Sequence, residues 1–350
     1  MFFRSLADAK SASSLVRRDL ENSGWKCNEQ KSDWEPRQIG EWLGITIDTI
    51  RMLFVMPDKK VLKLKSRLTR LIYDYPNLCV RDVASLSGFV ISLGLALGPV
   101  ARLFTRQMYF FIQSRQSWND ILPASEGVLQ ELQFWLNHVE AFNGYPINRP
   151  LCFSAILTCD ASESGYGAHL CVCKDRKFCS GMWSECERGK SSTYRELKAI
   201  LLALKSFSSF LTGGGKVKVF CDNQNVVRIV HCGSSVVELQ QLAVDIFSFC
   251  MTNCISFQAQ WIPRDENHLA DYLSRLVDPD DWMLNPSLFQ FLSQMWGPFD
   301  IDRMACHLNC QLARFNSKFW CPGTEAVDCF SQDWGGSCSN YVLSPSLLDQ

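Results

Sequence analysis

Glycine and proline are scarce in this chain, with 20 Gly and 13 Pro among 350 residues, which excludes a fibrous repeat. The sequence begins MFFRSLADAK and reaches a charged residue too soon for a signal peptide, so no export is expected. Residues 83–101 contain no charge, but their serines, glycines and proline make a poor membrane span. We therefore expect no membrane segment, and a buried helix or helical hairpin at 83–101.

Apolar side chains, by contrast, are plentiful. A composition of 47% apolar, 12% aromatic and 20% charged residues is typical of a globular protein and rules out a mainly disordered chain. The length is sufficient for two or three compact domains.

The net charge differs along the chain. Basic residues exceed acidic ones by 4 in residues 1–150 and by 1 in residues 151–277, whereas acidic residues exceed basic ones by 6 in residues 278–350. A polyanionic partner is therefore expected to bind the first two segments and not the tail.

Seventeen cysteines are spread through the chain. Many lie in apolar runs that predict strands, where a thiol acts as a small hydrophobic group. We therefore expect a reduced, intracellular protein of the cytoplasm or the nucleus. Cys306, His307, Cys310 and Cys321 resemble metal ligands only weakly, because their spacing fits no established zinc pattern.

Residues 1–57 are expected to contain a strand hairpin. The sequence EWLGITIDTIRMLFVMP is rich in β-branched residues, which predicts two strands closed by Pro57. Residues 58–75 carry apolar side chains at helical spacing. A basic stripe on another face of this helix consists of Lys60, Lys63, Arg67 and Arg70. The stripe is either a solvated surface or a surface that binds phosphates.

Residues 80–145 are expected to be all-helical, and the sequence NGYPINRP after them is a linker. The pattern then changes at residues 151–277. Three successive strands predict an antiparallel meander, followed by a long helix, a fourth strand, further helices, a fifth strand and a final helix. This order predicts an α/β fold with a mixed five-stranded sheet and flanking helices.

Four acids occupy informative places in this pattern. Asp160 and Asp222 end the first and fourth strands, Glu196 lies on the first long helix and Asp271 on the final helix. Each alone could be a surface residue or a helix cap, but together they predict a shared rim of carboxylates. Such a cluster requires cations, because adjacent like charges raise one another's pKa. Hard oxygen ligands suit Mg²⁺, and two Mg²⁺ ions would clamp an in-line displacement at a phosphodiester.

The segments around these acids resemble the ribonuclease H domain of retroelement reverse transcriptases. They read LTCDASESGYGAHL, STYRELKAI, VKVFCDNQNVV and WIPRDENHLADYLSR. The N-x-x-A-D ending, Asn267 to Asp271, is similar to gypsy-like and DIRS-type elements in particular. The resemblance implies a ribonuclease H-like fold at 151–277, two Mg²⁺ ions with Mn²⁺ as an alternative, and no small-molecule cofactor. It also implies an RNA–DNA hybrid as the partner, with other parts of a retroelement polyprotein as further candidate partners.

The flanking segments extend the resemblance. The sequence GWKCNEQKSDWEPRQIGEWLGITIDT resembles the stretch after a polymerase active site, which makes 1–57 a palm remnant and 58–150 a thumb-like or connection-like helical region. The tail resembles the segment after the ribonuclease H domain in DIRS-type elements, and 278–350 is an acidic appendix without an assigned role. The aromatic-x-Asp-Asp turn of a polymerase is absent, and the only Asp-Asp pair, Asp280–Asp281, lies beyond the nuclease segment. DNA synthesis by this chain alone is therefore not expected.

The resemblance also implies roles for individual residues. Asp160 would bridge both metal ions, Glu196 and Asp222 would complete one metal site, and Asp271 the other. Glu196 would also lie near the 2′-hydroxyl beside the cut, which distinguishes RNA from DNA.

Residues beside these acids have two interpretations each. Asn223 and Gln224 match positions whose amides contact the hybrid, although Asn223 fits a loop cap equally well. Ser192 is either a nucleic-acid contact or, more simply, a helix N-cap. His268 lies on the first turn of the final helix, three residues before Asp271, whereas cellular ribonucleases H place a mobile product-release histidine in the preceding loop. Three aromatic residues could stack on a sugar or a base, but aromatic residues at such positions more often belong to the core, which is what we expect of Tyr166, Trp183 and Trp261.

The sequence thus predicts Mg²⁺-dependent endonucleolytic hydrolysis of the RNA strand of RNA–DNA hybrids, giving 5′-phosphate and 3′-hydroxyl ends. The alternative from another class is a non-catalytic relic of a retroelement polyprotein that still binds nucleic acid. A polynucleotidyl transferase such as an integrase fits less well, because its acid pattern lacks the helix glutamate after the third strand.

Overall fold

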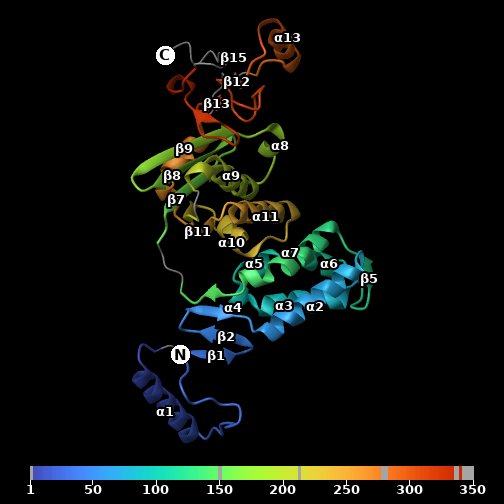
Figure 1. Ribbon diagram of the computed structural model, residues 1–350, viewed down its shortest axis with the longest axis vertical. Coiled ribbons are helices and arrows are strands. Elements are labelled where there is room, and N and C mark those ends of the chain that lie inside the picture. Colours follow the sequence, from blue (N-terminus) through green and yellow to red (C-terminus); the bar gives the residue numbers. More distant parts are fainter. Residues whose placement is uncertain (1–2, 149–151, 212–213, 277–282, 335–338, 341–350) are drawn as a thin grey trace. The chain divides into compact units, whose positions relative to one another are not determined.

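The computed structural model describes residues 3–148, 152–211, 214–276, 283–334 and 339–340 (Figure 1). The contacts between residues group the chain into two units. Met1–Ala101 and Arg115–Arg149 form the first, and Arg102–Ser114 and Pro150–Gln350 form the second. The interpretation of 1–57, 58–150, 151–277 and 278–350 as palm remnant, thumb-like region, nuclease domain and appendix stays a prediction.

The first unit joins a small antiparallel sheet to a group of helices. The sheet has the order β1-β2-β3-β6. Its strands are β1 (Ile39–Trp42), β2 (Ile45–Asp48), β3 (Leu53–Val55) and β6 (Tyr145–Pro146). The longer helices are α1 (Leu6–Asn22), α2 (Asp58–Asp74), α3 (Val80–Ser92) and α7 (Glu126–Phe142), and short turns form α4 (Gly94–Leu97) and α5 (Val100–Leu103).

Helix α2 forms where the apolar spacing predicts it. Val61, Leu64, Leu68 and Leu71 are buried at the i, i+3, i+7 and i+10 positions of one face, which leaves the basic residues on the other faces. The expectation of an all-helical 80–145 is wrong in two places, because β5 (Ile121–Pro123) pairs with β4 (Asn77–Cys79) and Tyr145 begins β6, which pairs with β3. Such a pairing between distant residues has no local hydrophobic period from which it could be predicted.

The second unit is built on a mixed five-stranded sheet, which confirms the predicted fold class. The strands are β7 (Ala155–Ala161), β8 (Gly165–Val172), β9 (Asp175–Met182), β10 (Lys216–Cys221) and β11 (Ser256–Trp261). Their order is β11-β10-β7-β8-β9. The β7-β8-β9 meander is antiparallel, whereas β10 runs parallel to both β7 and β11. The ends of β7 and β10 therefore meet at one edge of the sheet.

Helices cover both faces of this sheet (Figure 1). The helices that contact it are α9 (Ser192–Ser206), α10 (Gln224–Cys232), α11 (Val237–Thr252) and α12 (His268–Ser274), and the same unit also contains α6 (Arg106–Gln113) and α8 (Glu185–Arg188). Asp160 of β7 and Ser180 of β9 hydrogen-bond to α12, whereas Cys221 of β10 hydrogen-bonds to Glu196 of α9. Neighbouring residues of a strand point to opposite faces, so α9 and α12 reach the same sheet edge from opposite sides.

The described part of the appendix packs onto the same unit. It contains α13 (Pro286–Trp296) and two short parallel strand pairs, β12 (Ile301–Asp302) with β15 (Ser339–Asn340) and β13 (Asn316–Ser317) with β14 (Ala326–Val327). Trp320 forms a β-bridge with Cys179 of the edge strand β9, and the His307 ring lies 6.3 Å from that of Tyr166. Asp280–Asp281 lies outside the described residues.

The cysteines in the described ranges form no disulfide bond with one another. Cys306, Cys310 and Cys321 pack with Ala305 and Phe315 as a small apolar cluster instead of forming a ligand set. No helix made by the described residues has both the length and the apolar character needed to cross a membrane.

Candidate active site

Asp160 is the most enclosed of the four acids, at 8% exposure near the end of β7. The Ser274 hydroxyl donates a hydrogen bond of 2.6 Å to its Oδ2, and the Asn267 amide donates one of 3.4 Å to its Oδ1. Burial raises the pKa of Asp160, and the negative charges of Asp222 and Asp271 raise it further, against the Ser274 hydrogen bond. The carboxylate is thus held in place by two donors while its charge remains incompletely compensated.

Glu196 faces the same sheet edge from α9. The Asn223 amide donates to Oε1 at 3.1 Å, and the Cys221 thiol donates to Oε2 at 3.2 Å. Burial raises the pKa of Glu196 to about 7, with the charges of Asp222 and Asp160 acting in the same direction. Burial, together with the nearby Glu196 charge, also raises the pKa of the Cys221 thiol, so Cys221 stays protonated and acts as a donor.

Asp222 follows β10 directly, and the Trp261 indole donates a hydrogen bond of 2.9 Å to its carbonyl oxygen. Burial raises the pKa of Asp222, although the Arg264 charge opposes this shift. Within the described ranges, Glu196, Cys221 and Asp222 form the one group of three or more His, Cys, Asp or Glu ligand atoms within 4.8 Å of one another. The expected core position of Trp261 is wrong, since this residue is 41% exposed.

Asp271 differs from the other three acids. On α12 it forms ion pairs with Arg275 at 2.8 Å and Arg264 at 3.6 Å. The hydrogen bond from Arg275 lowers the pKa of Asp271, and both arginine charges contribute. This carboxylate is therefore ionised at neutral pH.

The structure brings the four predicted acids to one edge of the sheet. Asp160 acts electrostatically on Glu196, Asp222 and Asp271 act on Asp160, and Asp271 acts on Asp222. Asp160 and Asp222 come from the ends of adjacent parallel strands, and Glu196 and Asp271 from the helices on either face. The role of each in chemistry stays a prediction.

The residues that were predicted to contact nucleic acid beside the four acids lie in different environments. Asn223 caps α10 by accepting from the backbone N–H groups of Asn225 and Val226, and the same side chain holds Glu196. Gln224 and His268 are exposed first residues of α10 and α12.

The interpretation of Ser192 as the N-cap of α9 is wrong. Ser191 has the extended backbone of a cap, and its hydroxyl accepts from the Tyr194 N–H, whereas Ser192 is the first helical residue. Two adjacent serines satisfy the same sequence pattern, so the pattern alone could not separate them. Tyr166 and Trp183 are buried, as expected.

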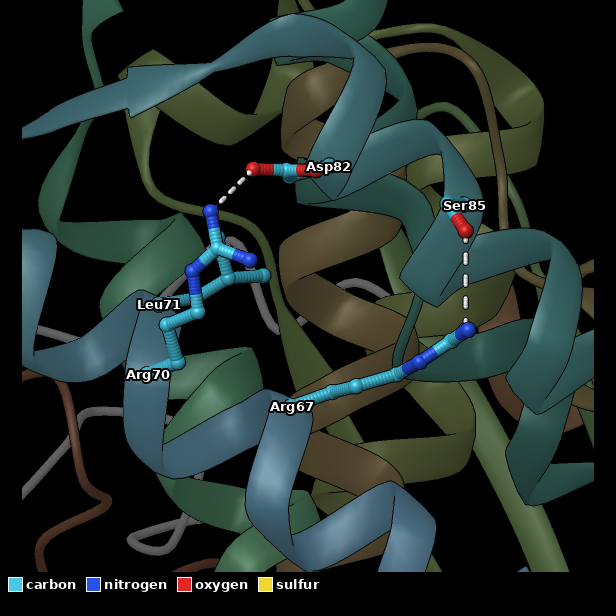
Figure 2. Close-up of a pocket in the computed structure, with 5 residues that line it drawn as sticks. All are labelled: Arg67, Arg70, Leu71, Asp82 and Ser85. Atoms are coloured by element: carbon cyan, nitrogen blue, oxygen red, sulfur yellow. Dashed lines mark hydrogen bonds and ion pairs between the residues drawn. The ribbon is translucent and has the colours of Figure 1, made fainter.

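The four basic residues of α2 belong to the other unit. Figure 2 shows two of them, Arg67 and Arg70. Arg70 pairs with Asp82 at 3.0 Å and Asp74 at 3.7 Å, so its charge is neutralised internally. Lys63 and Arg67 lie over the Phe89 ring, at 5.7 and 5.1 Å from its centroid. Lys60 extends toward Gly44 between β1 and β2. Phosphate binding by Lys60, Lys63, Arg67 and Arg70 stays a prediction.

The donors that hold the acids were not predicted from the sequence. Ser274 is fully buried and lies three residues after Asp271 on α12, a spacing that places both on one helix face. Asn267 is 1% exposed and also donates to the Cys159 carbonyl at 3.2 Å. The sequence shows Asn267 at the start of the N-x-x-A-D ending, but it could not predict the contact with Asp160, which lies 107 residues earlier.

One comparison with known proteins gives a family match within the second unit. A family model described as reverse transcriptase-like matches residues 153–277. The comparison with curated proteins gave no match. Residues 153–277 are therefore similar to the reverse transcriptase-like family, and they contain the mixed five-stranded sheet with its flanking helices.

Three solved structures illustrate the likeness. The N-terminal ribonuclease H domain of a Mycobacterium tuberculosis protein, solved as a fusion with maltose binding protein, is 18% identical, with coverage of 35% of this chain and 91% of that chain and a TM-score of 0.28. Ribonuclease H1 of the archaeon Halobacterium salinarum is 15% identical, with coverage of 34% and 91% and a TM-score of 0.27. The foamy viral protease-reverse transcriptase in complex with an RNA/DNA hybrid is 16% identical, with coverage of 82% of this chain, 37% of that chain and a TM-score of 0.35.

The donor set of the four acids fits divalent magnesium. Carboxylate oxygens are the ligands that Mg²⁺ prefers, and the protonated Cys221 thiol adds no competing soft ligand. Burial is the main cause of the raised pKa values of Asp160, Glu196 and Asp222, and repulsion between neighbouring carboxylates raises them further. A bound divalent cation would remove this repulsion.

The metal-free protein is expected to lose stability as the pH rises from 4.5 toward about 7, the ordinary and folded pKa values of Glu196. In this window the folded state binds more protons than the unfolded state, so raising the pH favours unfolding. The expected loss is on the order of 1–3 kcal/mol, since one pKa unit corresponds to about 1.4 kcal/mol. Thermal unfolding in EDTA between pH 4 and 8 measures it. Glu196→Gln should flatten this part of the curve, and an unchanged curve would contradict the assignment.

Proposed function

We propose that this chain hydrolyses the RNA strand of RNA–DNA hybrids endonucleolytically with Mg²⁺, as the ribonuclease H portion of a gypsy-like or DIRS-type retrotransposon reverse transcriptase. The observation that carries the proposal is the convergence of Asp160, Glu196, Asp222 and Asp271 at one sheet edge. The family match at residues 153–277 supports it. DNA synthesis by this chain alone is not part of the proposal.

Each residue has a defined task in this reaction. Asp160 would contact both ions, Glu196 and Asp222 would hold one, and Asp271 the other. When bound, the two ions supply an activated water and stabilise the leaving 3′-oxygen. Ser274 and Asn267 orient Asp160, and Asn223 orients Glu196 beside the 2′-hydroxyl of the RNA strand.

The proposal is tested by incubating the full chain with an RNA–DNA hybrid whose RNA strand is end-labelled and measuring cleavage. The unmodified protein should cut in Mg²⁺ but not in EDTA, leaving 5′-phosphate and 3′-hydroxyl ends. Asp222→Asn should bind the hybrid without cutting it, whereas Asp175→Asn, at an exposed acid of β9, should cut normally. Equal cutting by the Asp222→Asn protein and the unmodified protein would refute the assignment.

Ser274→Ala is expected to slow cleavage about tenfold near neutral pH and to move the acidic limb of the pH–rate profile to higher pH. The hydrogen bond that this change removes lowers the pKa of Asp160, so without it this carboxyl ionises only at higher pH. Initial rates between pH 5 and 9 measure the change. Ser206→Ala removes another buried serine hydroxyl, which donates to the Leu202 carbonyl within α9, and the pH–rate profile of this variant should keep its shape. A parallel fall at every pH would indicate general destabilisation instead of an altered Asp160.

A nucleic-acid-binding relic is the second candidate function. Arg264 and Arg275 already compensate Asp271 without a metal ion, which favours this alternative. A relic would bind the hybrid equally well with and without Mg²⁺ and would not cut it. Measuring binding by gel shift and cleavage on the same samples separates the two functions.

A further inference from the structure

We propose that the first unit contains a binding site for single-stranded nucleic acid at the surface of α3. A backbone phosphate would lie between Arg67, Arg81 and Ser85, and an unpaired base would stack on Trp118. This site goes beyond the hydrolysis of hybrids and does not depend on it.

Two adjoining hollows form the site. The first has a volume of about 140 Å³ and is lined by Arg67, Arg70, Leu71, Asp82 and Ser85 (Figure 2). The second has a volume of about 460 Å³ and is lined by Arg81, Ala84, Ser85 and Trp118. Ser85 of α3 lines both hollows, so they adjoin at this residue.

The charge of this surface is unevenly compensated. Arg70 is paired with Asp74 and Asp82, but neither Arg67 nor Arg81 has a carboxylate within 4.0 Å among the described residues. The nearest polar contact of the Arg67 guanidinium is the Ser85 hydroxyl at 3.5 Å, and Figure 2 shows the two side chains pointing toward each other. Phosphate oxygens readily accept hydrogen bonds from guanidinium groups and from hydroxyls.

Trp118 provides a stacking surface next to these donors. The residue is 46% exposed, although it sits on a tightly held loop. The Arg81 N–H donates to its carbonyl oxygen at 3.0 Å, and Asp120 accepts from the backbone N–H groups of Gln116 and Ser117. The Arg115 guanidinium lies 3.9 Å from the indole centroid.

These features favour a single strand over a duplex. Bases within a duplex are covered on both faces by their neighbours, so only an unpaired base can stack on an exposed indole. Base stacking on aromatic side chains beside a basic groove is the way proteins bind single strands without sequence preference. The expected ligand is therefore a single-stranded oligonucleotide of either sugar type.

Fluorescence anisotropy with the full chain in EDTA tests the site. The probes are labelled dT15, rU15 and a 15-base-pair DNA duplex. Trp118→Ala should weaken binding of both single strands about 5- to 100-fold and barely change duplex binding, while Trp118→Phe should restore most of the affinity. Trp42→Ala, at a tryptophan of the same unit that is 59% exposed, is the matched control and should bind normally.

Charge variants test the phosphate contacts. Arg67→Gln and Arg81→Gln should each weaken single-strand binding several-fold and reduce the slope of log affinity against log salt by about 0.7. Arg51→Gln, at an exposed arginine paired with Asp48, should not. Unchanged affinity in Trp118→Ala, or equal losses on strand and duplex, would overturn the proposal. Failure of the nuclease proposal would instead show as absent cleavage with these affinities intact.

Discussion

Asp160→Asn is expected to abolish hybrid cleavage while making the metal-free protein more stable near neutral pH. Asp160 is the one acid proposed to contact both ions, and charge stabilisation by metal ions contributes several kcal/mol to such reactions. The expected loss of rate is therefore at least about 100- to 10,000-fold. Because burial and neighbouring carboxylates raise the pKa of Asp160, its ionised form destabilises the folded state once the pH exceeds the ordinary aspartate range. A neutral amide removes that cost.

Two measurements on the same preparation test this expectation. Thermal unfolding in EDTA at pH 7 should give a higher Tm for Asp160→Asn than for the unmodified protein, and added Mg²⁺ should raise the Tm of the unmodified protein alone. Asp302→Asn is a matched control, since Asp302 is 2% exposed and burial raises its pKa, yet it lies in the appendix. Asp302→Asn should cut normally. A lower Tm for Asp160→Asn would show that its charge is already compensated in the folded protein.

Gly167→Ala is expected to destabilise the second unit by about 3 kcal/mol and to reduce cleavage even where the protein remains folded. Gly167 lies opposite Asp160 in the β7-β8 pair, where β8 passes directly beneath α12. A Cβ atom there would overlap the backbone of Ser274 and Leu273. Overpacking of this kind typically costs about 1–3 kcal/mol, and here the obstacle is backbone that cannot rotate away. The displaced helix carries both Asp271 and the donor to Asp160.

Urea unfolding together with initial cleavage rates measures both effects. Gly189→Ala is the matched control, because a Cβ atom there would meet nothing within 4 Å. Its stability and rate should remain close to those of the unmodified protein. If Gly167→Ala lost stability but kept the full rate per folded molecule, the close approach of β8 to α12 would not position the site.

Several features of the second unit could be predicted from local sequence. The apolar runs that end in Asp160 and Asp222 predicted strands, and the spacing of Leu197, Ile200, Leu201 and Leu204 predicted the helix that carries Glu196. Hydrophobic periodicity depends only on residues that are close in the chain, so it can be recognised without knowledge of the fold. The cap of α9 was misassigned to Ser192 because the choice between adjacent serines depends on backbone angles.

The order of the predicted strands and helices along the sequence was sufficient to predict the mixed sheet. It also predicted that the four acids lie at strand ends or on helices that pack against the sheet. Tertiary structure alone decided which donors surround those acids, why Trp261 remains exposed beside Asp222, and how the appendix joins the edge of β9. The physical reason is separation along the chain. Ser274 and Asp160 are 114 residues apart, and such a contact exists only after the helices and strands between them have packed.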